Sequence, residues 1–204
     1  MSVKDYDFLF KIFGVGECVT GRRSLFYSYI QNYFKDDYLS EMLEMLEGKI
    51  TKKIEIENKL VKCIIKMPVS CGERGFEKAI QTNERILKYL NGILLIYDIT
   101  SLKSFELIKE YNERINENGP SNLKKVLVGT KCDLEDERKV NTEEGKKLAK
   151  ELGINNFFEV SAKTGKNVEE AFNSLFREIL MDYKKPIILN DKEKKDEKKN
   201  RCAK

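Results

Sequence analysis

KIFGVGECVTGRR, residues Lys11 to Arg23, is the stretch that decides the fold. An apolar strand is predicted to run into Gly16, and four residues separate Gly16 from Gly21. This spacing matches a phosphate-binding loop, G-x-x-x-x-G-K-[ST], but Arg22 replaces the lysine and Arg23 replaces the magnesium-binding hydroxyl residue. Since glycine is also the commonest residue of tight turns, a plain strand-to-helix turn remains the alternative at this point.

The rest of the chain alternates apolar strands with amphipathic helices. Nearly continuous apolar strands are typical of a parallel sheet that is buried on both faces. The pattern therefore predicts a doubly wound α/β fold, with a mostly parallel sheet and helices on both faces. Strands are predicted over residues 7–15, 50–57, 60–67, 92–97, 126–128 and 157–160, with Asn58 in a hairpin turn. Helices follow Gly21 and span 104–116 and 142–152, and a final helix has Asn167 as its N-cap and an apolar face from Val168 to Leu180.

Ligands of such sheets bind outside the carboxyl ends of the strands. The Gly16 loop, the segment at Thr130 and the segment at Ser161 each follow a predicted strand. We therefore expect these three segments to meet at one edge of the sheet.

Length and charge indicate one domain followed by a tail. The 204 residues carry a net charge of +4, and residues 184–204 hold nine basic against four acidic side chains. The tail therefore carries +5 and residues 1–183 carry about −1, which excludes a basic nucleic-acid-binding body. We expect a domain over 1–183 and a charged, disordered tail over 184–204.

Cysteine and histidine usage narrows the chemistry. The chain has no histidine, and its five cysteines form no CxxC pair, so histidine general-base catalysis and a zinc site are not expected. An odd cysteine count without a signal peptide is typical of a reducing cytosol. We expect a cytoplasmic protein with no nucleic-acid partner. Cys202 lies third from the end, whereas prenylation needs the fourth position, so contact with a membrane would be peripheral at most.

Four further segments carry a resemblance to a known family. Alone, the Thr130 segment could be a solvated loop and the Ser161 segment a helix entry. The Gly16 loop, the Thr130 segment and the Ser161 segment, together and in this order, are far more specific evidence than any one of them alone. The chain resembles the Ras superfamily of small GTPases, Rab/Ras-like, over roughly residues 7–183. The matching segments are GTKCDLED at 129–136, FFEVSAKTGKNVEEAF at 157–172, YDITSLKSFE at 97–106 and IQNYFKDDY at 30–38.

The resemblance implies a Ras-like P-loop G domain that binds GTP or GDP. Asp133 would accept hydrogen bonds from two adjacent N–H groups of guanine, a donor pair that adenine lacks. Lys131 and Lys163 would cover the two sides of the base, and Ala162 would offer its N–H to the guanine oxygen. Phe34 would lie over the base, although a core phenylalanine is an equal alternative. The implied nucleotide-binding residues are Gly16, Gly21, Arg22, Arg23, Phe34, Thr130, Lys131, Asp133, Ser161, Ala162 and Lys163.

Besides Arg22, four metal or catalytic positions on the phosphate side depart from the family pattern. Arg23 replaces the metal-binding hydroxyl, Glu41 the switch threonine, Val69 the metal-side aspartate, and Glu73 the glutamine that orients water. No metal ligand or catalytic residue is therefore assigned, Mg²⁺ is doubtful, and slow or absent GTP hydrolysis is expected.

The first functional hypothesis is a Rab/Ras-like switch in signalling or vesicle trafficking, with effector and regulatory proteins bound through its switch regions. The second is a nucleotide-independent pseudo-GTPase interaction module built on the same fold. An orthodox GTPase that is completed by a partner's residues is the third.

Overall fold

The computed structural model describes residues 5–32, 34, 50–66 and 87–184. Predictions for residues 35–49, 67–86 and the tail lie outside this part of the chain. The strands are β1 (Phe8–Val15), β2 (Ile50–Ile56), β3 (Lys59–Lys66), β4 (Gly92–Asp98), β5 (Lys124–Thr130) and β6 (Asn156–Glu159). The helices are α1 (Arg22–Gln31), α4 (Leu102–Asn118), α5 (Thr142–Glu151) and α6 (Val168–Lys184), with a short 3₁₀ helix, η1, at Glu135–Glu137.

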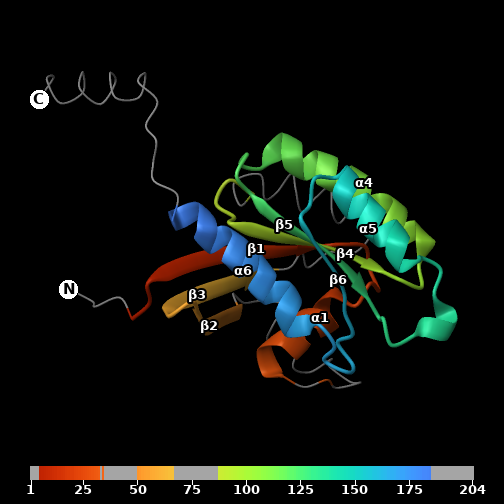
Figure 1. Cartoon of the computed structure of the whole chain (residues 1–204), viewed down its shortest axis with the longest axis horizontal. Coiled ribbons are helices and arrows are strands. Elements are labelled where there is room, and N and C mark those ends of the chain that lie inside the picture. Colours follow the sequence, from red (N-terminus) through yellow and green to blue (C-terminus); the bar gives the residue numbers. More distant parts are fainter. Residues whose placement is uncertain (1–4, 33, 35–49, 67–86, 185–204) are drawn as a thin grey trace, which may run out of the picture.

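The six strands form one sheet in the order β2-β3-β1-β4-β5-β6 (Figure 1). Only β2 runs antiparallel to its neighbour, and the other pairs are parallel. This arrangement confirms the predicted mostly parallel α/β sheet. The carboxyl ends of β1, β4, β5 and β6 therefore share one edge, which is where ligands of such sheets bind.

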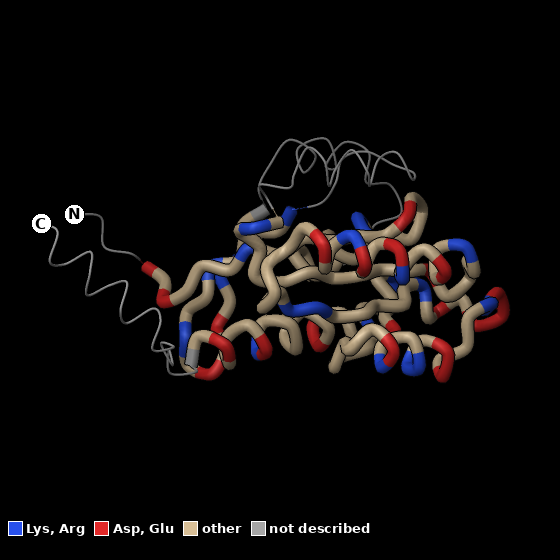
Figure 2. Tube along the Cα trace, turned by 90° about the horizontal axis from the view of Figure 1, so that it is seen from above, with Lys and Arg blue, Asp and Glu red and all other residues tan. Residues whose placement is uncertain are grey.

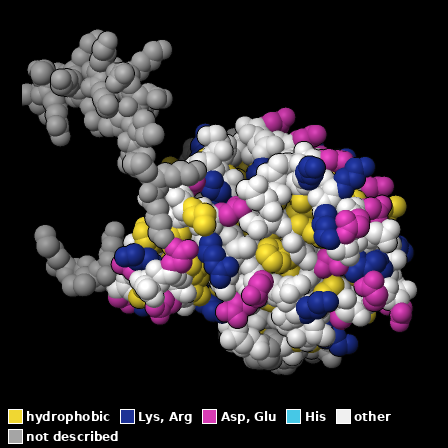
Figure 3. Space-filling view, viewed as in Figure 1, with side chains coloured by type: hydrophobic (Ala, Val, Ile, Leu, Met, Phe, Trp, Pro, Cys, Tyr) yellow, Lys and Arg dark blue, Asp and Glu magenta, His cyan; other side chains and the backbone are white. Residues whose placement is uncertain are grey.

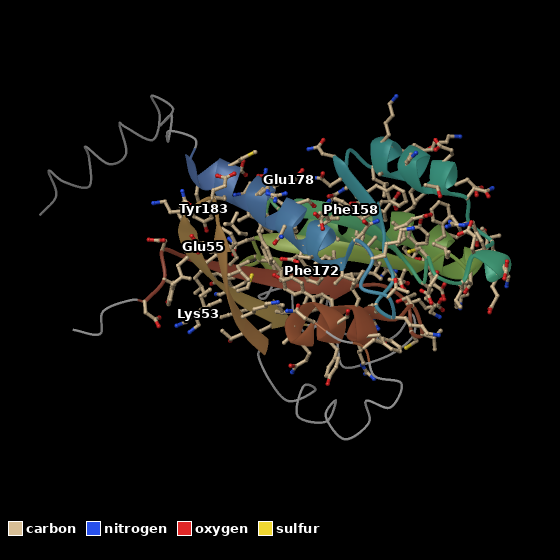
Figure 4. The ribbon with its side chains drawn as sticks, turned by 60° about the horizontal axis from the view of Figure 1, so that its bottom comes forward. Lys53, Glu55, Phe158, Phe172, Glu178 and Tyr183 are labelled. Carbon is tan, nitrogen blue, oxygen red and sulfur yellow. The ribbon has the colours of Figure 1, made fainter. Side chains whose placement is uncertain are left out.

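Successive residues of the central strands point to opposite faces and build two cores. On one face α1 and α6 cover the sheet. The Phe172 ring of α6, labelled in Figure 4, stacks on Tyr29 of α1 with ring centroids 3.8 Å apart. On the other face α4 and α5 pack through residues such as Ile108 and Leu148. In β4, Ile96 belongs to the first core and Tyr97 to the second, which confirms helices on both faces.

The β2–β3 hairpin turns at Glu57 and Asn58, and both residues have positive φ, at 49° and 59°. Two consecutive left-handed residues are typical of a type I′ turn, whose twist matches that of the flanking strands. The predicted turn at Asn58 is therefore confirmed.

Two elements are longer than their apolar patterns indicated. β5 was predicted over residues 126–128, but its ladder with β4 runs from Lys124 to Thr130. α4 begins at Leu102, because the Ser101 side chain accepts a hydrogen bond from Ser104 N and caps the helix. Backbone pairing and capping determine where a strand or helix ends, and the apolar periodicity of the sequence carries no information about either.

Charged residues of both signs are interspersed along the described chain (Figure 2), and their side chains are interspersed over the face in view in Figure 3. Among the described residues, no helix combines the length and apolarity that crossing a membrane would require. The start of β1 and the end of α6 lie at the same pole of the body, opposite the carboxyl edge (Figure 1).

Candidate nucleotide site

The loop between β1 and α1 has backbone requirements at both glycines. A Cβ on Gly16 would collide with the carbonyl oxygen of Ile96 in β4, so a side chain there would push the loop away from the sheet. Gly21 is the N-cap of α1 with φ 75°, a left-handed conformation that glycine adopts without strain. The loop therefore delivers the N-terminus of α1 to the carboxyl edge, as predicted.

Two polar contacts hold this loop, one within the loop and one to α4. Thr20 Oγ1 donates to Glu17 O at 2.8 Å, and Glu17 pairs with Lys103 Nζ of α4 at 3.0 Å. Among the described cysteines, Cys63 and Cys132 are buried free thiols.

Thr130 joins the phosphate loop to the strand ends. Its buried Oγ1 lies 2.6 Å from Thr20 O in the loop and 2.9 Å from Tyr97 O in β4. A hydroxyl has one proton to donate, so these two carbonyls share it. Thr130 therefore ties the loop between β1 and α1 to the end of β4.

Lys131 follows in a left-handed conformation, φ 61°, and runs over Gly21. Its Cε lies 3.9 Å from the point where a Cβ on Gly21 would sit, and its Nζ lies 2.6 Å from the carboxylate of Asp98. Asp98 is buried and also accepts from the backbone and side chain of Thr100 at 2.8 Å. Sequence reasoning missed this partner, although Asp98 is the charged residue that closes an otherwise apolar strand.

The two base-side loops are neighbours because β5 and β6 pair in parallel. Cys132 N donates to Val160 O at 3.1 Å, which links the Thr130 loop to the start of the Ser161 loop. Asp133 is exposed at this edge, so its carboxylate is open to a ligand.

The Ser161 loop is tightly closed on itself. Ser161 is buried, its Oγ accepts from Thr164 N at 3.1 Å, and its N–H donates to Lys166 O at 3.1 Å. Ala162 is half-buried and Lys163 is exposed. Phe34 is half-buried, but its chain neighbours are not described, so its position over a base is not tested.

Arg22 is the unusual charge of the site. Its guanidinium is partly buried at the first turn of α1, and burial, with a smaller contribution from neighbouring Arg23, lowers the pKa of Arg22 to about 10. It remains a cation at neutral pH. Among the described residues no carboxylate neutralises it, so the site has spare positive charge beside a helix N-terminus, an arrangement that suits an anion.

The sheet order and the three loops at its carboxyl edge define a nucleotide-binding α/β domain of the Ras type. Residues 11–181 match the model of the Ras family, and the chain belongs to this family of small GTPases. Membership implies guanine-nucleotide binding.

The curated relatives are of the Rab type. The chain is 37% identical to Ras-related protein Rab-13 of Mesocricetus auratus, over 98% of both chains. It is 36% identical to Ras-related protein Rab-8B of Homo sapiens, over 87% of this chain and 81% of that protein. It is also 36% identical to GTP-binding protein ypt2 of Schizosaccharomyces pombe, over 88% of this chain and 85% of that protein. The resemblance to the Rab-like branch is thereby confirmed.

Proposed function

We propose that this protein is a Rab-type guanine-nucleotide switch in vesicle trafficking or signalling that holds its nucleotide with little help from Mg²⁺ and hydrolyses GTP very slowly. Effector and regulatory proteins would bind through the switch regions. The observation that carries the proposal is the Thr130 hydroxyl, which lies within 2.6 Å of the phosphate loop and directly precedes the base-side residues Lys131 and Asp133. This contact supports a single connected site for phosphate and base.

On the phosphate side, the residues suit an anion better than a metal. Arg22 supplies a cation that no carboxylate of the described residues neutralises, and Arg23 puts a second arginine where the metal-binding hydroxyl is expected. The other positions that weaken the metal site, Glu41, Val69 and Glu73, lie outside the described residues. We propose that Arg22 takes up phosphate charge that a magnesium ion would otherwise share.

The first experiment is titration of a fluorescent guanosine diphosphate, with dissociation followed in Mg²⁺ and in EDTA. The expected result is measurable binding, with a dissociation rate that changes less than about threefold on chelation. A large acceleration by EDTA would show that a metal is held. Absence of binding at millimolar nucleotide would replace the switch with a nucleotide-independent interaction module.

Base selection is tested with Asp133→Asn. Xanthine carries a carbonyl where guanine carries its amine, so the amide should favour xanthosine diphosphate and reject guanosine diphosphate. A charge-assisted hydrogen bond contributes about 1.5–3 kcal/mol, so the ratio of the affinities for the two diphosphates should change by at least about tenfold. Asp136→Asn is the matched control, since Asp136 is an exposed acid of η1 three residues away. If Asp133→Asn keeps the wild-type preference, the role given to Asp133 is wrong.

Hydrolysis is tested by single-turnover phosphate release. A family member with the full catalytic set turns over GTP unaided at only about 10⁻⁴ s⁻¹. Since Glu73 stands at the position of the water-orienting glutamine, we expect a rate below that value. A rate at or above it would refute the proposed loss.

A further inference from the structure

Arg138, just after η1, uses all five of its N–H donors. Its Nε and one terminal nitrogen donate to the two carboxylate oxygens of Glu135, both at 2.8 Å. Its two terminal nitrogens also donate to the two oxygens of Glu159, at 2.6 and 2.9 Å. The fifth N–H reaches the carbonyl of Val140 at 2.9 Å. A planar guanidinium fits two carboxylates in this way, and a lysine ammonium does not.

The two carboxylates differ in environment. The side chains of Arg138 and Glu159 are only 12% and 14% exposed, whereas that of Glu135 is 67% exposed. Both acceptors raise the pKa of Arg138, and the hydrogen bond from Arg138 lowers the pKa of Glu135. The ion pair of Arg138 with Glu159 is therefore the largely buried one, and its two residues lie 21 positions apart in the sequence. The ion pair of Arg138 with Glu135 is local in sequence and exposed to solvent, so it should contribute little to stability.

Glu159 is the last residue of β6 and connects several elements. Its carboxylate also accepts from Thr142 Oγ1 at 3.1 Å, at the start of α5. Its backbone carbonyl accepts from Asn167 Nδ2 at 2.8 Å, directly before α6. This contact anchors the start of α6 to β6. Glu159 thus fixes the strand end from which the Ser161 loop departs.

Arg138 consequently bridges the two base-side loops. It follows the loop that carries Asp133 by five residues, and its partner Glu159 precedes Ser161 by two. The loops are otherwise linked by the hydrogen bond from Cys132 N to Val160 O. The guanidinium is the side chain that fixes the far side of the Asp133 loop against β6.

We propose that Arg138 is a positioning residue for base selection: its fork to Glu159 sets the spacing between the Asp133 loop and the Ser161 loop, and hence the fit of guanine. The inference rests on the proposed guanine site and adds to it a residue that does not touch the nucleotide. Sequence reasoning did not single out Arg138 or Glu159.

The test compares guanosine diphosphate with inosine diphosphate, which lacks the 2-amino group. The ratio of their affinities measures the Asp133 fork itself, and wild type should prefer the guanosine form by about tenfold or more. Arg138→Gln and Glu159→Gln should each reduce this ratio to about threefold or less. Arg138→Lys keeps the charge without the double fork and should fall between. Glu135→Gln removes only the solvent-exposed ion pair and should keep the wild-type ratio.

A control separates positioning from stability. Glu178→Gln, on α6 (Figure 4), weakens the 2.5 Å contact with Asn156 at the opposite end of β6. It should lower the melting temperature and leave the ratio unchanged. If Arg138→Gln weakens both nucleotides equally, or if Glu178→Gln lowers the ratio as much, Arg138 has only a structural role and the inference is overturned. If wild type binds neither nucleotide, both the proposed function and this inference fail. That result differs from equal weakening of both nucleotides, which would overturn the inference alone.

Discussion

Arg22 faces opposite demands in the empty and the loaded protein. Without an anion, Arg22 is a partly buried cation, and burial lowers its pKa to about 10. Because burial disfavours the charged form, this charge opposes folding. We predict that Arg22→Gln stabilises the nucleotide-free protein by about 1 kcal/mol or more, since a lowered pKa of one unit corresponds to about 1.4 kcal/mol. The same change should weaken guanosine diphosphate binding by at least about tenfold, because a hydrogen bond to a charged group is lost.

Urea unfolding and nucleotide titration measure the two effects on the same samples. Arg177→Gln is the control, because Arg177 is exposed on α6 and should change neither quantity. If Arg22→Gln leaves nucleotide affinity unchanged, phosphate charge is taken up elsewhere.

Val19 stores strain in the phosphate loop. It is β-branched, has φ 61° and is 85% exposed, so no packing compensates its left-handed backbone. That conformation costs roughly 1–2 kcal/mol outside glycine. We predict that Val19→Gly raises the free energy of unfolding by about 0.5–1 kcal/mol, after the extra entropy of glycine in the unfolded chain is subtracted. Val19→Ala should gain less, and a loss of stability with glycine would contradict the strained conformation.

At the scale of elements, the hairpin turn offers a similar test. Type I′ turns favour asparagine followed by glycine, and this turn has Glu57 in the first left-handed position. Glu57→Asn should therefore stabilise the protein by about 0.5–1 kcal/mol, seen as a higher melting temperature. Glu55→Asn, two residues earlier in the extended strand, should not stabilise it. A gain of equal size at position 55 would mean that charge, and not turn conformation, is responsible.

The elements could be predicted well where apolar periodicity defined them. The runs at β1 and β4 indicated buried parallel strands, and the loop spacing from Gly16 to Gly21 placed α1. The ends of β5 and α4 could not be predicted, because ladder pairing and the Ser101 cap set them. For the candidate site, local motifs pointed to Thr130 and Asp133, whereas the proposed positioning pair, Arg138 and Glu159, meets only after the chain has folded.

At the scale of the whole molecule, nucleotide binding should appear as stability. A ligand that binds only the folded state adds about 2.7 kcal/mol at one hundred times its dissociation constant. We predict that guanosine diphosphate raises the melting temperature by several degrees in EDTA as well as in Mg²⁺, whereas adenosine diphosphate does not. Differential scanning fluorimetry checks this. A shift confined to the Mg²⁺ samples would argue for an ordinary metal-dependent site.

The closeness of the two ends of the described chain has a practical consequence. The Tyr183 ring near the end of α6 lies 5.5 Å from Phe8 at the start of β1, at the pole opposite the carboxyl edge (Figure 1). Dyes attached near these two ends would stay in efficient energy transfer for as long as the domain is folded. Nucleotide exchange at the proposed site, on the far edge of the sheet, would leave that signal unchanged. Loss of transfer would therefore report unfolding alone, which gives a readout of folding that is independent of ligand binding.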